Sequence, residues 1–125
     1  MKLIIGFALL AVVVARPEDT YDSKYDNFNV DEVLENERLF LGYVKCFEGK
    51  GKCTAEGNQI KEWIPEGIKT SCGKCTEKQK VLVAKTLSAT KVKYPDVYED
   101  LMKKNNPDGK YDEALAAFLA KHLST

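Results

Sequence analysis

Two short stretches, Cys46-Phe-Glu-Gly-Lys-Gly-Lys-Cys53 and Cys72-Gly-Lys-Cys75, decide how this chain of 125 residues is held together. They contain all four of its cysteines. Gly49 and Gly51 make the first stretch a flexible turn that can fold back on itself, and the second stretch can close a very small loop. An even number of cysteines in an exported chain is typical of disulfides. We therefore expect the local pairings 46–53 and 72–75, with crossed pairings as the alternative.

Free thiolates would have two other uses. The Cys72-x-x-Cys75 spacing is a common half of a zinc site, but the six residues between Cys46 and Cys53 make an unusual second half. A redox C-x-x-C motif opens a helix that follows a strand, and no strand pattern precedes Cys72. Export through an oxidising compartment also disfavours free thiolates. We therefore expect no metal and no cofactor.

The N-terminus predicts export. Met1-Lys2 is a short positive start, and Leu3–Ala15 is an apolar or glycine run that is too short to cross a bilayer core of about 30 Å. Val13 and Ala15 stand at the −3 and −1 positions of a signal-peptidase site. We predict a signal peptide over residues 1–15 and one secreted domain over residues 16–125. An uncleaved anchor is the alternative, and stable membrane insertion is not expected elsewhere.

The charges give no sign of a polyanion partner. The chain carries 19 Lys and Arg residues against 19 Asp and Glu residues, and the two signs alternate along it. A nucleic-acid-binding protein normally gathers basic residues on one face or tail. We therefore expect no nucleic-acid partner.

Helix start and stop signals divide the first half of the domain. Asn29, Asn36 and Thr54 are good N-caps for three successive helices. The Gly49-Lys-Gly51 turn ends the second of these helices. Pro65 is expected to kink the third or break it into two pieces.

The second half carries signals of the same kind. Thr76-x-x-Gln79 is a capping box that opens a long helix. Pro95 starts another short helix, and Asn105-Asn-Pro-Asp-Gly109 is a strong turn before the last one. Because no run alternates with the period of a strand, the sequence predicts an all-α bundle of about six amphipathic helices.

Each predicted helix has an apolar face. Periodicity alone favours the packing of these faces into a solid core, and the alternative is an apolar cavity for a small molecule. The members of the faces are Val30, Val33, Leu34, Leu39, Phe40, Tyr43, Val44, Phe47, Ile60, Trp63, Ile64, Ile68, Val81, Leu82, Leu87, Val92, Val97, Tyr98, Leu101, Met102, Tyr111, Ala114, Leu115, Phe118 and Leu119.

No pattern points to an enzyme. His122 is the single histidine, and it stands near the end of the last helix, where a surface cation is favourable. No serine stands in a nucleophile elbow, and no glycine-rich phosphate loop is present. We therefore expect no catalytic residues.

The cysteine spacing C-x6-C-x18-C-x2-C, with Tyr25-Asp-Asn27 upstream, resembles the insect chemosensory protein family. The resemblance continues in order along the chain. Its further words are Asn29-Val-Asp-Glu-Val-Leu34, Asn36-Glu-Arg-Leu39, Tyr43-Val-Lys-Cys46, Gly51-Lys-Cys53-Thr-Ala-Glu-Gly57, Lys74-Cys-Thr-Glu-Lys-Gln79 and Pro107-Asp-Gly-Lys-Tyr111.

The resemblance implies about six helices in a compact bundle around an internal hydrophobic channel, with disulfides 46–53 and 72–75. It implies a secreted, monomeric carrier of small hydrophobic ligands in sensillar lymph or haemolymph. The ligands would be semiochemicals, fatty-acid-like chains, long-chain alcohols or esters. The alternative is a secreted interaction or developmental factor with a solid core, acting through a receptor or another protein.

The resemblance also implies which residues form the channel. Tyr25 and Asp26 would lie at its mouth, Gln79 and Leu87 on its wall, and Tyr98 where the family often has tryptophan. Gly67 and Asn105 replace a usual alanine and tyrosine, and we expect them to loosen or reshape local packing. The full expected lining is Tyr25, Asp26, Phe40, Tyr43, Ile60, Trp63, Ile64, Ile68, Gln79, Leu82, Leu87, Tyr98 and Leu101.

Overall fold

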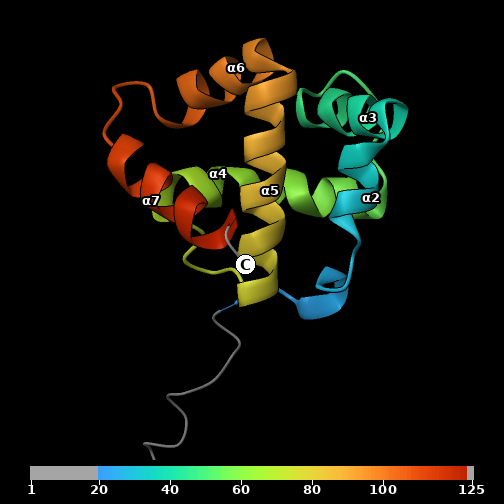
Figure 1. The fold of residues 1–125 in the computed structure, drawn as a ribbon, viewed down its shortest axis with the longest axis horizontal. Coiled ribbons are helices and arrows are strands. Elements are labelled where there is room, and N and C mark those ends of the chain that lie inside the picture. Colours follow the sequence, from blue (N-terminus) through green and yellow to red (C-terminus); the bar gives the residue numbers. More distant parts are fainter. Residues whose placement is uncertain (1–19, 124–125) are drawn as a thin grey trace, which may run out of the picture.

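The computed structural model describes residues 20–123, which form helices joined by turns (Figure 1). The predicted signal peptide, residues 1–15, lies outside the described residues. Within them the prediction of an all-α fold with about six helices is confirmed, and no described helix is long and apolar enough to cross a membrane. The elements are the 3-10 turn η4 (Ser23–Tyr25) and the α-helices α2 (Val30–Glu35), α3 (Glu37–Phe47), α4 (Ala55–Thr70), α5 (Glu77–Lys93), α6 (Pro95–Asn105) and α7 (Asp112–Leu123).

The predicted caps start the helices. The side chains of Asn29, Asn36 and Thr54 each accept a hydrogen bond from the backbone N–H three residues on, at 3.2, 3.2 and 2.9 Å. The Thr76–Gln79 capping box is present with both of its bonds. Because these bonds satisfy N–H groups that have no partner inside the helix, they fix where each helix begins. Pro65 lies inside α4 without dividing it into two helices.

Helix α5 is the centre of the bundle. Figure 1 shows α5 with α4 crossing it, α6 and α7 on one side and α2 and α3 on the other. It packs against α2, α4, α6 and α7. Because it is covered on several sides, its buried residues do not form one stripe: Val83 and Ala84 are fully buried, while Val92, predicted on the apolar face, is 77% exposed.

Two threonines are buried in α5 without loss of hydrogen bonding. The Thr86 hydroxyl donates to the Leu82 carbonyl at 2.8 Å, and the Thr90 hydroxyl donates to the Thr86 carbonyl at 2.7 Å. These bonds within the helix satisfy the hydroxyl donors, so both threonines can face the core.

Helices α4 and α5 approach closely at Gly67. A Cβ atom on this glycine would lie 2.7 Å from Val83 Cγ1. The missing side chain therefore allows a close approach, so Gly67 reshapes the packing at this crossing and does not loosen it.

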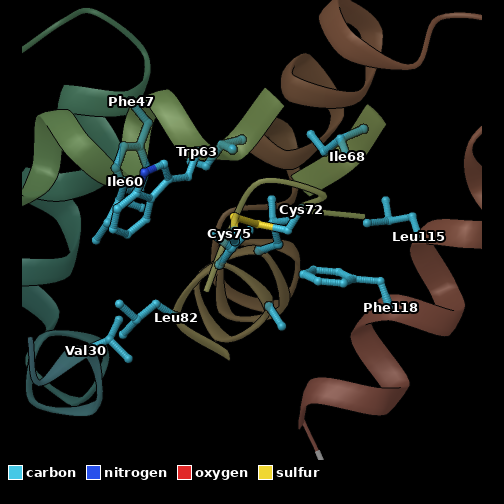
Figure 2. Close-up of a cluster of buried hydrophobic side chains, with 14 of the residues drawn as sticks. Val30, Phe47, Ile60, Trp63, Ile68, Cys72, Cys75, Leu82, Leu115 and Phe118 are labelled. Carbon is cyan, nitrogen blue, oxygen red and sulfur yellow. A yellow bond between two sulfur atoms is a disulfide. The ribbon is translucent and has the colours of Figure 1, made fainter. Parts of the chain in front are cut away.

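The main core lies between α4, α5 and α7 (Figure 2). Trp63, Ile64 and Ile68 of α4 are almost completely buried there, and Leu115 and Phe118 of α7 pack on the same cluster. A second, smaller cluster joins α3 to α6; its buried members are Phe40, Val44 and Val97.

Both disulfides are local, as predicted. Cys46 bonds to Cys53 and Cys72 bonds to Cys75, and no described cysteine is free. The first bridge closes the turn between α3 and α4, and the second closes the turn between α4 and α5. The crossed pairings are thereby excluded.

Three residues in or next to α7 differ from what the sequence predicts. His122 was expected at the surface, but it is 5% exposed and packs against Phe118 with 4.9 Å between ring centroids. The cause is the contact of α7 with α5, which covers the last turn of α7. Tyr111 precedes the helix, and Ala114 is exposed.

Candidate functional site

A narrow apolar pocket lies between α2, α3, α4 and α5, and we call it the inner pocket. Its volume is about 10 Å³, which is about the space of one water molecule. It is lined by Phe28, Val30, Val33, Leu34, Phe40, Tyr43, Phe47, Ile60 and Thr86.

A larger pocket lies between α3 and the start of α4, and we call it the outer pocket. Its volume is about 170 Å³. Two cationic side chains, Arg38 and Lys52, lie among apolar and small residues there. The full lining is Arg38, Leu39, Gly42, Tyr43, Cys46, Lys52, Thr54 and Gly57.

Tyr43 lines both pockets. Its ring packs against the inner-pocket residues Phe28 and Phe47, with centroid distances of 6.1 and 6.3 Å. Its hydroxyl accepts a hydrogen bond from the Thr54 hydroxyl at 3.2 Å. Tyr43 is therefore shared by the two pockets, with its ring packed on aromatic neighbours and its hydroxyl held by one exposed hydrogen bond.

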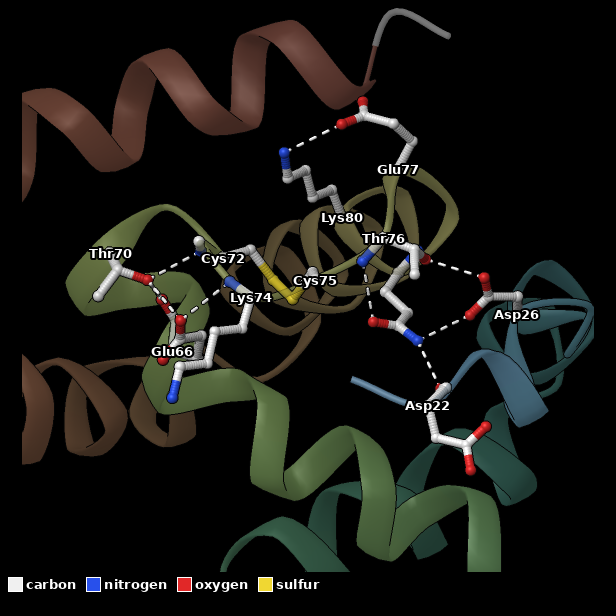
Figure 3. Close-up of a disulfide and its surroundings, with 12 residues drawn as sticks. Asp22, Asp26, Glu66, Thr70, Cys72, Lys74, Cys75, Thr76, Glu77 and Lys80 are labelled. Atoms are coloured by element: carbon white, nitrogen blue, oxygen red, sulfur yellow. Dashed lines mark hydrogen bonds and ion pairs between the residues drawn. A yellow bond between two sulfur atoms is a disulfide. The ribbon is translucent and has the colours of Figure 1, made fainter. Parts of the chain in front are cut away.

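A polar network holds the segment before α2 against the start of α5 (Figure 3). Gln79 Nε2 donates to Asp26 Oδ1 at 2.7 Å and to the Asp22 carbonyl at 2.8 Å. The Thr76 hydroxyl donates to Asp26 Oδ2 at 2.9 Å, and Gln79 Oε1 accepts from the Thr76 backbone N–H at 3.0 Å. Asp26 and Gln79 thus hold the segment before α2 against the start of α5. Neither residue lines the inner or the outer pocket.

Three of the residues predicted for the channel, Phe40, Tyr43 and Ile60, meet at the inner pocket. Leu101 lines a separate surface pocket with Val97 and Asp100. The other predicted residues do not line the inner pocket. Trp63, Ile64, Ile68, Leu82 and Leu87 are buried in the core, and Tyr25 and Tyr98 are partly buried against it.

The lining also includes residues that the predicted channel omitted. Four of them could have been found from the sequence, because they lie on the predicted apolar faces: Val30, Val33, Leu34 and Phe47. Phe28 precedes the first helix, and the polar Thr86 belongs to no apolar face. Neither pattern nor composition marks those two as pocket residues.

Trp63 is fully buried, and its indole N–H has no hydrogen-bond partner among the described residues. One side of its ring packs on Tyr21 at 6.0 Å between centroids. Figure 2 shows the indole extending toward Phe47 and Ile60, which both line the inner pocket. An unpaired buried donor costs about 1–3 kcal/mol, so this group lowers the stability of the core.

Tyr98, at the position where the family often has tryptophan, stays a neutral phenol. Burial raises the pKa of its hydroxyl, and the Asp112 carboxylate raises it further. Among residues 20–123, no three His, Cys, Asp or Glu side chains are grouped to hold a metal ion.

Fold and site together define a small helical protein with two local disulfides and a narrow apolar inner pocket beside the outer pocket. The chain belongs to the insect pheromone-binding family, A10/OS-D, whose profile matches residues 21–113. This confirms the chemosensory resemblance. The family is one of binding proteins and not of enzymes.

The relatives agree with this membership. Ejaculatory bulb-specific protein 3 of Drosophila melanogaster is 40% identical over 111 residues, which cover 89% of this chain and 88% of the relative. The antennal chemosensory protein A6 of the moth Mamestra brassicae has a similar structure, with a TM-score of 0.66 and 33% identity over 81% of this chain and 94% of that chain. A chemosensory protein solved in complex with bromo-dodecanol gives a TM-score of 0.66 at 32% identity, over 82% of this chain and 99% of that chain.

Proposed function

We propose that this protein is a secreted, monomeric carrier that holds a small hydrophobic ligand in its inner pocket. The observation that carries the proposal is an apolar pocket built by four helices that shares one lining side chain, Tyr43, with an outer pocket. A relative of the same fold has been solved with bromo-dodecanol, which supports ligands with a long alkyl chain. Fatty-acid-like chains, long-chain alcohols and esters, including semiochemicals, have this chemistry.

Binding is driven by the burial of the alkyl chain, at about 0.8 kcal/mol per methylene group. A pocket of about 10 Å³ has to widen before such a chain can enter. Phe28, Leu34 and Tyr43 are its partly exposed wall residues, and an outward movement of their side chains would widen it. Because both disulfides are local, no covalent bond opposes a shift of α2 or α3 against α5.

The small volume of the inner pocket favours one other candidate function. A protein with a filled core would act as a secreted interaction or developmental factor through a receptor or another protein. The two functions differ in a simple measurement, because only the carrier binds alkyl chains with micromolar affinity.

The test is displacement of a fluorescent lipid probe by alcohols and acids with chains of about 12 to 18 carbons. Trp63 is the single tryptophan, so its emission reports entry into the adjacent pocket independently. We expect displacement by wild type and a large loss in Val33→Phe, which fills the inner pocket. Val92→Phe, the same change at an exposed position, is the matched control. Circular dichroism checks that both variants fold, and failure of every chain to bind wild type would favour the interaction factor.

A further inference from the structure

We propose that the outer pocket binds the carboxylate of an ionised long-chain acid, and that Tyr43 is the gate through which its tail enters the inner pocket. The proposal deepens the proposed function and rests on it. It assigns a head-group site, with Arg38 and Lys52 as the residues that select an acid over the alcohol of equal length.

The outer pocket carries uncompensated positive charge. Arg38 and Lys52 line it, and its lining contains no acidic side chain. Neither cation has a hydrogen-bond or ion-pair partner within residues 20–123. By contrast, Lys85 and Lys93 are paired with acidic side chains at 3.0 and 3.5 Å. A carboxylate in the outer pocket would therefore meet two cations without displacing a partner from either.

The fold explains why these two cations meet. Arg38, Gly42 and Cys46 follow one another at intervals of four residues, so they share one face of α3. Cys46 is bonded to Cys53, and Lys52 is the neighbour of Cys53. The disulfide thus brings a lysine from the following loop to the end of the helix face that carries Arg38. The guanidinium offers two parallel N–H donors to a carboxylate, and the lysine adds a second charge.

The gate follows from the contacts of Tyr43. Its hydroxyl is held by one exposed hydrogen bond, from Thr54. Beside the ring stands Gly57, where an added Cβ would lie 3.4 Å from Tyr43 Cε2 and 3.4 Å from Cys46 Sγ. Gly42, which also lines the outer pocket, has no atom within 4 Å of an added Cβ. A rotation of the ring toward the outer pocket therefore breaks one hydrogen bond and gives up the ring contacts with Phe28 and Phe47.

Volume requires that both pockets take part. At about 170 Å³ the outer pocket is smaller than the roughly 300 Å³ at which small-molecule sites begin. It has room for a head group and the first part of a chain. The apolar tail then needs the inner pocket, and Tyr43 is the side chain that both pockets share.

The test compares dodecanoate with 1-dodecanol at neutral pH, because the two ligands differ in head-group charge and share the chain length. The variant is Arg38→Gln with Lys52→Gln. The matched control is Lys69→Gln with Lys103→Gln, which removes two exposed lysines that line neither pocket. All four are surface positions, and thermal unfolding checks that each protein folds.

We expect the Arg38 and Lys52 variant to bind dodecanoate about fivefold more weakly, since two exposed ion pairs are lost. Its affinity for 1-dodecanol should stay within twofold of wild type, and the control should match wild type for both ligands. Raising the salt concentration should weaken dodecanoate binding to wild type and leave the alcohol unchanged, because charge pairs at the surface are screened.

Two results would overturn the inference. Unchanged dodecanoate affinity in the Arg38 and Lys52 variant, or an equal loss for acid and alcohol, would show that the two cations do not hold a carboxylate, and the carrier function would stand. If wild type binds neither ligand, the inference and the proposed function fail together.

Discussion

Ser71 adopts the left-handed backbone conformation at the C-terminal end of α4, with φ 57° and ψ 37°. This conformation is unfavourable for any residue with a Cβ atom and is the usual place for glycine after a helix. We predict that Ser71→Gly raises the free energy of unfolding by about 0.5–1 kcal/mol, measured by urea denaturation. Ser88→Gly, inside α5, is the control and should lower it by a similar amount. A loss of stability at position 71 would contradict the prediction.

At Gly67, a single added atom is expected to change the stability of the protein. Because an added Cβ would meet Val83 Cγ1 at 2.7 Å, we predict that Gly67→Ala lowers the free energy of unfolding by about 1–3 kcal/mol. Gly42→Ala is the matched control within α3, where the added methyl group meets nothing within 4 Å. That variant should be neutral or more stable by up to about 1 kcal/mol, because alanine favours the helix. Equal stability of the two variants would show that α4 and α5 can separate without cost.

At the scale of elements, the segment from Tyr21 to Phe28 depends on Gln79. We predict that Gln79→Ala lowers the free energy of unfolding by about 2–3 kcal/mol, since it removes a bond to the Asp26 carboxylate and leaves its partners unpaired. Hydrogen exchange should quicken at the Tyr21 amide, which donates to the Lys74 carbonyl at 2.8 Å.

Gln59→Ala is the control for this prediction. Gln59 donates to Glu62 at an exposed position of α4, and its loss should cost less than about 0.5 kcal/mol. If Gln79→Ala lowers the free energy of unfolding no more than Gln59→Ala does, the network does not hold the segment from Tyr21 to Phe28 in place.

The contact of α7 with α5 makes stability depend on pH through His122. Burial lowers the pKa of the imidazole below its ordinary value of 6.5, Lys121 and Lys80 lower it further, and Glu77 opposes the shift. On acidification, the His122 imidazole is therefore protonated near pH 6.5 in the unfolded chain, and only at a lower pH in the folded chain. We predict that the contribution of His122 to the free energy of unfolding is constant well above pH 6.5 and falls as the pH drops below about 6.5.

Urea denaturation at pH about 7.5 and about 5.5 measures this slope, in a range where His122 is the single side chain with an ordinary pKa between them. The His122→Phe variant should lose the slope. A wild type that becomes more stable on acidification over this range would contradict the sign of the shift.

At the scale of the whole molecule, the Cys46–Cys53 disulfide is expected to stabilise through loop closure alone. We predict that Cys46→Ala with Cys53→Ala lowers the free energy of unfolding by about 2–3 kcal/mol, the value for a loop of about eight residues. The helical signal in circular dichroism should remain, because the bridge does not join distant helices. Loss of the whole helical signal would show that this bridge is required for folding.

The parts of the fold that the sequence predicts are those with local causes. Asn29, Asn36, Thr54 and Thr76 mark helix starts through bonds only three residues long, and the spacing of Cys46 and Cys53 marks a turn. These signals give the helix count and the disulfides. The family resemblance adds the apolar interior.

Features that depend on packing between helices are not predicted. The burial of His122 and Val83 comes from what covers α5, and no periodicity within one helix reveals it. Thr86 reaches the inner pocket because its hydroxyl bonds within its own helix, which hides a polar residue among apolar ones. Asp26 and Gln79 bond across 53 positions of the chain, and the sequence gives no sign of this pair.

The two disulfides also determine whether cleavage by a digestive protease in the turns separates this protein into fragments. Lys50, Lys52 and Lys74 are exposed in turns, where trypsin-like enzymes cut most readily. Each of these lysines lies inside a loop that a disulfide closes. A cut at any of them leaves both ends tied at the same corner, so the nicked chain remains one covalent molecule.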